Sequence, residues 1–101
     1  MKRIEGFFQF GKLETMVEAM EEAGAKGITV FYARGRGTAE RKPIHTKRGT
    51  QMRVPLFNII DCIVTIVEDE LVDPVINSMK NSSFGSKGII VVSEVTSTIN
   101  I

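Results

Sequence analysis

The sequence predicts an α+β domain in which two helices cover one face of a four-stranded antiparallel sheet. The chain has 101 residues, 43% of them apolar, which suffices for one domain with a modest core and is too little for two. Segments with strand and helix patterns follow one another in the order β-α-β, a basic stretch, and β-α-β. Two such halves of this size pack as the ferredoxin-like βαββαβ sandwich.

The first half of the chain has the pattern strand, helix, strand. Residues 3–10 are short, partly β-branched or aromatic, and followed by Gly11, as is typical of a strand. Residues 12–23 repeat apolar side chains at helical spacing, and Gly24 follows where the helix should end. Residues 27–34 are rich in Ile, Val, Thr, Phe and Tyr and are predicted as the second strand.

A long central strand is predicted after the basic stretch. Residues 54–67 contain a continuous apolar run from Ile59, and Pro55 is confined to the beginning of the segment. Asp61 interrupts this run. It could be a buried functional carboxylate, but we prefer an interface or edge residue paired to an arginine or to backbone.

A second helix and a last strand complete the domain. Apolar residues recur at helical spacing over residues 71–79, and the helix should begin at Asp73 or hold Pro74 in its first turn, where proline is tolerated. Residues 81–88 are predicted as a loop and residues 89–95 as a core strand.

The predicted sheet is covered by helices on one face only. Its apolar runs, at residues 59–67 and 89–92, are not typical of strands whose second face meets water. We therefore expect the open sheet face to be covered by oligomerisation.

The stretch from Gly35 to Arg53 concentrates the positive charge. It holds six Lys and Arg against Glu40 alone, so it carries +5 while the rest of a chain with net charge +1 carries −4. Such a segment offers little to bury and is predicted as a flexible basic loop between the second and third strands.

The single cysteine and the N-terminal residues argue against a disulfide-bonded, cysteine-metal or membrane protein. Cys62 cannot form an intramolecular disulfide or a cysteine metal cluster, and its apolar surroundings favour a buried structural role over a reactive thiol. The start, MKRIEGFF, has no apolar h-region, and no apolar run approaches the roughly 18 residues that a membrane span requires. We expect a cytoplasmic protein that is not an integral membrane protein.

Residues 1–37 resemble the PII signal-transduction family: a strand leads to FGKL, a helix ends in EAGAKGITV, and a strand ends in GRG. HTKRGTQM, at residues 45–52, resembles that family's T-loop, and NSSFGSKGIIVV, at residues 81–92, its B-loop and next strand. The resemblance implies one PII-like domain over residues 1–101, with a T-loop-like basic segment at about residues 37–53. It also implies a homotrimer that binds an adenine nucleotide in clefts between subunits and presents its T-loop to a membrane transporter, channel or metabolic enzyme.

The resemblance assigns residues to two sites. Lys87 is the best single candidate for a phosphate contact, since it accompanies the free N–H groups of a glycine-rich turn that could form an anion nest. Without the resemblance, both glycine-rich segments would be read as plain turns, because neither completes a P-loop or a dinucleotide motif. The implied ligand-binding residues are Thr29, Gly35, Arg36, Gly37, Thr38, Arg41, Gly85, Ser86, Lys87 and Gly88. The implied partner-binding loop residues are Arg41, Lys42, His45, Lys47, Arg48 and Met52.

The chain also departs from the family pattern. The T-loop glutamine of members that sense 2-oxoglutarate is missing from GTAERK, and Met52 occupies the place of the tyrosine that some members modify. The family's C-terminal arginines have no counterpart in TSTINI. Fewer guanidinium groups favour a ligand with fewer phosphates than ATP, so ADP, AMP or a cyclic nucleotide become candidates beside ATP. No residue is assigned to a metal ion.

Two other classes of function fit the sequence less well. A nucleic-acid module could use the basic stretch, but the stretch has no aromatic residue for base stacking. An acylphosphatase-like enzyme needs an arginine in a phosphate loop after the first strand, where this chain has only Lys12. The acidic cluster of residues 68–73 suits the N-terminus of the second helix better than a divalent metal. We expect a regulator, not an enzyme or a nucleic-acid-binding protein.

Overall fold

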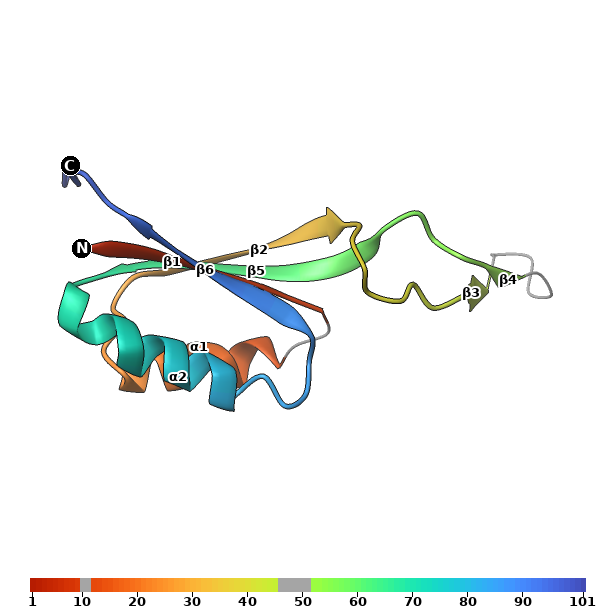
Figure 1. The fold of residues 1–101 in the computed structure, drawn as a ribbon, viewed down its shortest axis with the longest axis horizontal. Helices are drawn as coiled ribbons and strands as arrows, with labels where there is room; N and C mark the ends of the chain where they lie inside the picture. The colour runs from red at the N-terminus through yellow and green to blue at the C-terminus, as the bar shows by residue number, and fades with distance from the viewer. Residues whose placement is uncertain (10–11, 46–51) are drawn as a thin grey trace.

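Four strands form one antiparallel sheet and two helices lie against one of its faces (Figure 1). The computed structural model describes residues 1–9, 12–45 and 52–101. The order in the sheet is β2-β5-β1-β6, so the first strand lies between the third and the fourth long strands. The bounds are β1 Lys2–Phe8, α1 Leu13–Glu22, β2 Ile28–Gly35, β5 Asn58–Val67, α2 Val72–Asn81 and β6 Gly88–Glu94. This is the ferredoxin-like α+β sandwich, as predicted.

The helix ends agree with the local signals in the sequence. Gly24 has φ +113°, a conformation that L side chains rarely adopt, and it follows Ala23, the C-cap residue of α1. A 3-10 turn, η1 (Asp69–Leu71), leads into α2, and Pro74 lies in the first turn of α2, where its missing N–H removes no helical hydrogen bond. Asn81 belongs to α2 and Gly88 to β6, so the predicted loop is one residue too long at each end.

The largest difference from prediction is at the basic stretch. Residues 36–45 and 52–57, here called the arm, leave β2 and return to β5, and they extend away from the body along the 52 Å long axis of the molecule (Figure 1). The arm contains two short paired strands, β3 (Ile44–His45) and β4 (Met52–Arg53), where the sequence predicted only loop. Residues 54–57 precede β5 instead of beginning it, since Pro55 cannot donate to a sheet ladder.

The core lies between the helices and the sheet. Met16 and Met20 of α1 and Val75 and Met79 of α2 are at most 1% exposed, because the helical repeat places each pair on one face. They pack against side chains of the two central strands in one cluster. The buried sheet members of that cluster are Ile4, Phe8, Ile63 and Val67, and the partly buried Ile28 of β2 and Ile90 of β6 pack against it. Helix periodicity and strand alternation thus produce a single core.

The other face of the sheet carries no helix. Strand register places Cys62 between Phe7 and Phe31 on this face, where Phe31 is 49% and Ile89 of β6 is 60% exposed. Cys62 itself is 1% exposed, which confirms its predicted burial, and burial raises the pKa of its thiol. A broad apolar face is thus left uncovered by this chain.

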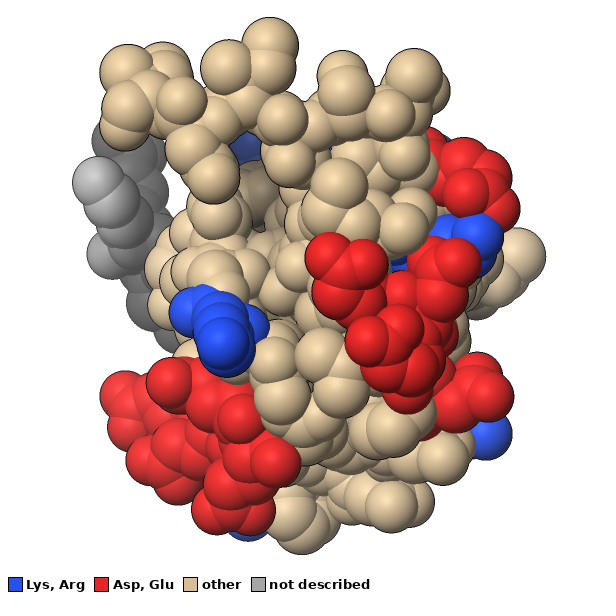
Figure 2. Space-filling view, turned by 90° about the vertical axis from the view of Figure 1, so that its left-hand side faces the viewer, with Lys and Arg blue, Asp and Glu red and all other residues tan. Residues whose placement is uncertain are grey.

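Charge is separated along the molecule. Seen from the end that carries the two termini, the surface shows two groups of carboxylates (Figure 2). Exposed acidic residues of α1's last turn and of residues 68–70 are at this end, whereas the arm leaves the opposite end (Figure 1). The arm therefore presents its positive charge well away from the acidic end of the body.

One ion-pair cluster ties the start of β1 to η1 and β6. The N-terminal ammonium lies 3.0 Å from Asp69 Oδ1, and Lys2 Nζ lies 3.9 Å from the same oxygen while it also pairs with Glu94. The hydrogen bond from the N-terminus, followed by the charge of Lys2, lowers the pKa of Asp69.

We predict that Asp69→Asn lowers Tm slightly at neutral pH and that the difference disappears in acid. A carboxylate with a lowered folded-state pKa stabilises the fold above its unfolded pKa of about 3.9, and this contribution is lost as the pH falls through the folded value. Melting curves of both proteins between pH 3 and pH 7 test this. A Tm difference that stayed constant into acid would contradict it.

Candidate functional site

A pocket of about 430 Å³ lies where the arm meets the body. One wall consists of Gly35, Arg36, Gly37 and Thr38, at the end of β2 and the start of the arm. The opposite wall includes Lys87 and Gly88 at the start of β6. The fold thus brings together two glycine-containing segments that are about fifty residues apart in the sequence, and that both belong to the predicted ligand site.

A second pocket of about 320 Å³ adjoins the first. It is lined by Gly85 and Ser86 together with Glu40 and Lys42 of the arm, and both pockets share Gln9 and Lys87. The Gln9 N–H donates to the Lys87 carbonyl oxygen at 3.1 Å, which extends the pairing of β1 with β6 up to the pocket edge. The predicted residues of the second glycine-rich turn therefore lie along one continuous hollow.

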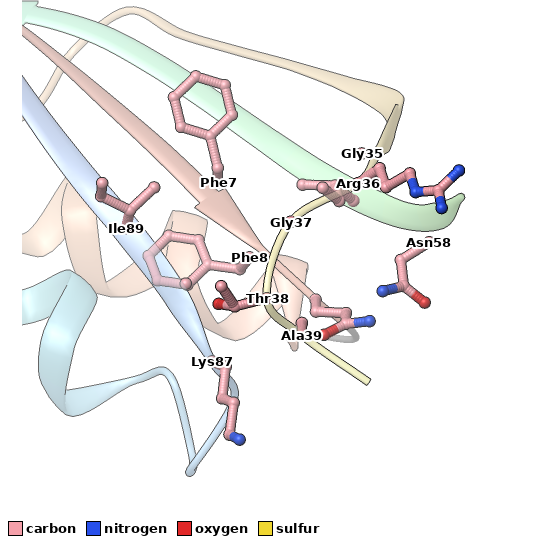
Figure 3. A pocket seen from close by; sticks show the side chains of 13 residues that line it. Phe7, Phe8, Gly35, Arg36, Gly37, Thr38, Ala39, Asn58, Lys87 and Ile89 are labelled. Carbon is pink, nitrogen blue, oxygen red and sulfur yellow. The ribbon is translucent and has the colours of Figure 1, made fainter. Parts of the chain in front are cut away.

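Apolar side chains and two cations set the character of the larger pocket (Figure 3). Phe7, Ile60 and Ile89 contribute apolar lining. The side chains of Arg36 and Lys87 extend in different directions from the two walls (Figure 3). Among the described residues, no carboxylate lies within ion-pair distance of either cation. An apolar lining with uncompensated positive charge suits a ligand that joins an apolar ring to an anion.

The fold requires glycine at some positions of the site but not at others. A Cβ at Gly88 would lie 2.4 Å from the carbonyl oxygen of Phe7, so close strand pairing already demands glycine there. Gly85 has φ +79°, which also favours glycine for backbone reasons. A Cβ at Gly37 would meet nothing within 4 Å. Gly37 is thus a glycine that the fold does not need, and close approach of a ligand would explain it.

Two hydrogen bonds close the base of the arm. Asn58 Nδ2 donates to the Glu40 carbonyl oxygen at 3.3 Å, and Arg41 Nη1 donates to the Leu56 carbonyl oxygen at 3.0 Å. Asn58 also lines the larger pocket. Arg41, in contrast, lines neither pocket, and its side chain holds the two legs of the arm together. A ligand in the pocket would therefore contact a residue that fixes the arm's base.

Thr29 is the predicted ligand residue that lies apart from the others. It is exposed on the open sheet face and pairs with Val64, whereas Gly35 pairs with Asn58. Gly35 lies six positions after Thr29 along β2, or about 20 Å away at 3.3 Å per residue. One chain alone does not bring Thr29 to the pocket.

The predicted partner-binding residues that the structure describes lie on the arm. Lys42 is exposed and borders the second pocket, and Met52 is 56% exposed and pairs with His45 across the β3–β4 ladder. Lys47 and Arg48 lie outside the described residues. Their role in partner binding stays a prediction, as does the ligand role of the pocket residues.

Sequence reasoning missed several pocket residues. Phe7, Gln9, Asn58 and Ile60 line the larger pocket, but in the sequence they look like ordinary members of strands or strand ends. Asn58 carried a signal that could have been used, since a polar residue at the start of an apolar strand requires a hydrogen-bond partner. Asp61 is half-buried and pairs in register with Phe8 and Tyr32.

The described residues form neither a metal-binding cluster nor a membrane-spanning helix. Over residues 1–9, 12–45 and 52–101, no group of three or more His, Cys, Asp or Glu side chains is arranged to hold a metal ion. In the same part of the chain, neither α1 nor α2 is long and apolar enough to cross a membrane.

Comparisons with known proteins identify the family. The sequence model described as "Nitrogen regulatory protein P-II" matches residues 1–101. A protein of that name from Rhizobium meliloti is 33% identical over 106 aligned residues, covering 100% of this chain and 91% of that protein. Another from Azospirillum brasilense is 35% identical over 85 residues, covering 82% of this chain and 72% of that protein. The chain belongs to the nitrogen regulatory protein P-II family of signal-transduction regulators.

Proposed function

We propose that this protein is a trimeric sensor that binds an adenine nucleotide (ATP, ADP or AMP) in clefts between subunits and thereby controls its arm. The observation that carries the proposal is the pocket shared by the Gly35–Gly37 segment and Lys87, at the base of the arm. Its volume of about 430 Å³ is within the usual range for small-molecule sites. Lys87 and Arg36 supply charges for phosphate, and Gly37 leaves room for it.

The distribution of residues supports a cleft between subunits. The open sheet face exposes large apolar side chains, Phe31, Ile66, Ile89 and Val91, each by 40% or more, and a second copy of the chain would cover them. Thr29 lies on this same face, far along β2 from the pocket. Packing of open faces in a trimer would allow Thr29 of one copy to face the Lys87 pocket of another.

The position of the pocket suggests how a ligand could act on the arm. Gly37 and Thr38 lie at the start of the arm and Asn58, the first residue of β5, follows its end, and all three line the pocket. A nucleotide can bias the arm only if it contacts the arm's conformations differently. Contacts at both legs satisfy this requirement, so nucleotide identity would determine how the arm is offered to a membrane transporter, channel or metabolic enzyme.

A thermal-shift panel with ATP, ADP, AMP, cyclic AMP and cyclic di-AMP tests the proposal, together with the mass in solution by light scattering. We predict a trimer mass. The preferred nucleotide, at about one hundred times its Kd, should stabilise the folded state by about 2.7 kcal/mol and raise Tm by roughly 10 to 20 °C. Preference for cyclic AMP or cyclic di-AMP would instead support a cyclic-nucleotide sensor. A monomer whose Tm is unchanged by every nucleotide would refute the proposal.

A further inference from the structure

The helices leave part of their own sheet face bare. They cover the half of the sheet near the termini, while β2 and β5 continue beyond them toward the arm (Figure 1). On β5, Ile63 is a core residue, so strand alternation places Ile59 on the same side, together with its partner Arg34 and with Tyr32 of β2. Tyr32 is 74% and Ile59 61% exposed. Large side chains on the helix side of the sheet thus face solvent here.

Two hollows lie side by side on this surface. The first, of about 520 Å³, is lined by Tyr32, Ala33, Arg34 and Ile59. The second, of about 330 Å³, includes Arg34 again, with Ile44, Leu56 and Phe57 of the arm. Arg34 lines both hollows. We call this the ribbon surface, defined by Tyr32, Arg34, Ile44, Leu56, Phe57 and Ile59.

The ribbon surface is distinct from the sites described above. It shares no lining residue with the pocket of Gly37 and Lys87. Tyr32, Arg34 and Ile59 also lie on the helix side of the sheet, opposite to the open face that carries Phe31. Packing of open faces in a trimer would therefore leave this surface available.

The ribbon surface combines apolar side chains with the positive charge of two arginines. The Arg34 guanidinium lies 6.0 Å from the Phe57 ring centre, and Arg53 borders the second hollow. Within the described part of the chain, neither arginine has a carboxylate within 4.0 Å. Asp61, which pairs with Tyr32, lies on the same face, toward the body. A complementary partner would present apolar side chains to the hollows and carboxylates to the arginines near the arm.

We propose that the ribbon surface binds an amphipathic helix of a partner protein, with apolar side chains in the two hollows and a carboxylate between them on Arg34. Side chains at i and i+4 of a helix are neighbours on one face, as two adjacent hollows require. A planar lipid surface fits two concave hollows less well than inserted side chains do. The proposal rests on the regulatory role proposed for the arm and does not depend on nucleotide binding.

Two synthetic helical peptides test the proposal by fluorescence anisotropy on the full chain. Both carry the same leucine stripe, flanked by Glu in one and by Lys in the other. The Glu-flanked peptide should bind at least about tenfold more tightly, and Arg34→Glu should remove that preference. Ile59→Ser should weaken binding of the Glu-flanked peptide by roughly tenfold, since it empties one hollow. Lys26→Glu and Val92→Ser, exposed charge and apolar changes elsewhere, serve as matched controls.

The outcomes separate this proposal from the proposed function. Equal binding of both peptides, or equal losses in the control variants, would mean general apolar adhesion and would overturn the proposal. So would binding of anionic lipid vesicles, lost in Arg34→Glu, without binding of the Glu-flanked peptide. If neither peptide binds while the nucleotide panel still raises Tm, the ribbon surface is not a docking site although the sensor function stands.

Discussion

Gly88→Ala is expected to destabilise the protein by about 3 kcal/mol, at the upper end of the usual cost of overpacking. The new Cβ would lie 2.4 Å from the Phe7 carbonyl oxygen and 2.6 Å from Phe8 Cδ1. The backbone oxygen cannot turn aside as a side chain can, because Gly88 and Phe8 are paired in the β1–β6 ladder. The strands must separate, and the wall of the pocket moves with them.

Gly37→Ala is the matched control for this substitution. Its Cβ would meet nothing within 4 Å, so its free energy of unfolding should change by no more than about 0.5 kcal/mol. Urea denaturation of both variants measures the difference. Nucleotide titration of Gly37→Ala adds a second readout, since a ligand that closely approaches this backbone should bind it more weakly. Equal stability of both variants would show that β1 and β6 are not held as closely as described.

The helices and the long strands could be predicted from the sequence because their apolar residues recur at regular, local spacing. Met16 and Met20 recur at the spacing of one helix face, and both are buried in the core as the pattern requires. The β3–β4 ladder could not be found in this way, because two residues per strand are too few to show an alternation. Its pairing depends on the path of the whole arm, which tertiary contacts such as that of Asn58 with Glu40 determine.

The sequence predicted many residues of the candidate site, but not how they are arranged in space. The glycine-rich segments around Gly37 and Lys87 were expected to share a ligand, and they line one pocket. Gly88 was expected in a nest for an anion, yet the Phe7 carbonyl explains its lack of a side chain without any ligand. That contact joins residues about eighty positions apart, so only the strand register reveals it. Likewise, only register shows that Thr29 lies far from Gly35.

Subunit mixing is expected to restore nucleotide binding that two separate variants lack. Lys87→Glu replaces an ammonium at the pocket with a carboxylate, and a lost charge-assisted contact alone should weaken binding roughly 10- to 100-fold. Thr29→Glu places a bulky anion on the exposed part of β2 that the pocket of another copy would face. Each variant should form trimers by light scattering and fail to show the nucleotide-induced rise in Tm.

When the two variants are unfolded together and refolded as a mixture, some clefts combine intact Thr29 from one copy with intact Lys87 from its neighbour. For random assembly in equal amounts this is about a quarter of all clefts, because each intact half comes from half of the subunits. Isothermal titration should then recover about a quarter of the wild-type binding capacity with unchanged affinity. A site contained within one chain predicts a different result. Thr29→Glu alone would then bind nucleotide as the wild type does, and the mixture would bind only as much as its Thr29→Glu subunits bind by themselves. The stoichiometry of the mixture therefore decides whether the distance between Thr29 and the pocket along β2 is bridged by a second copy.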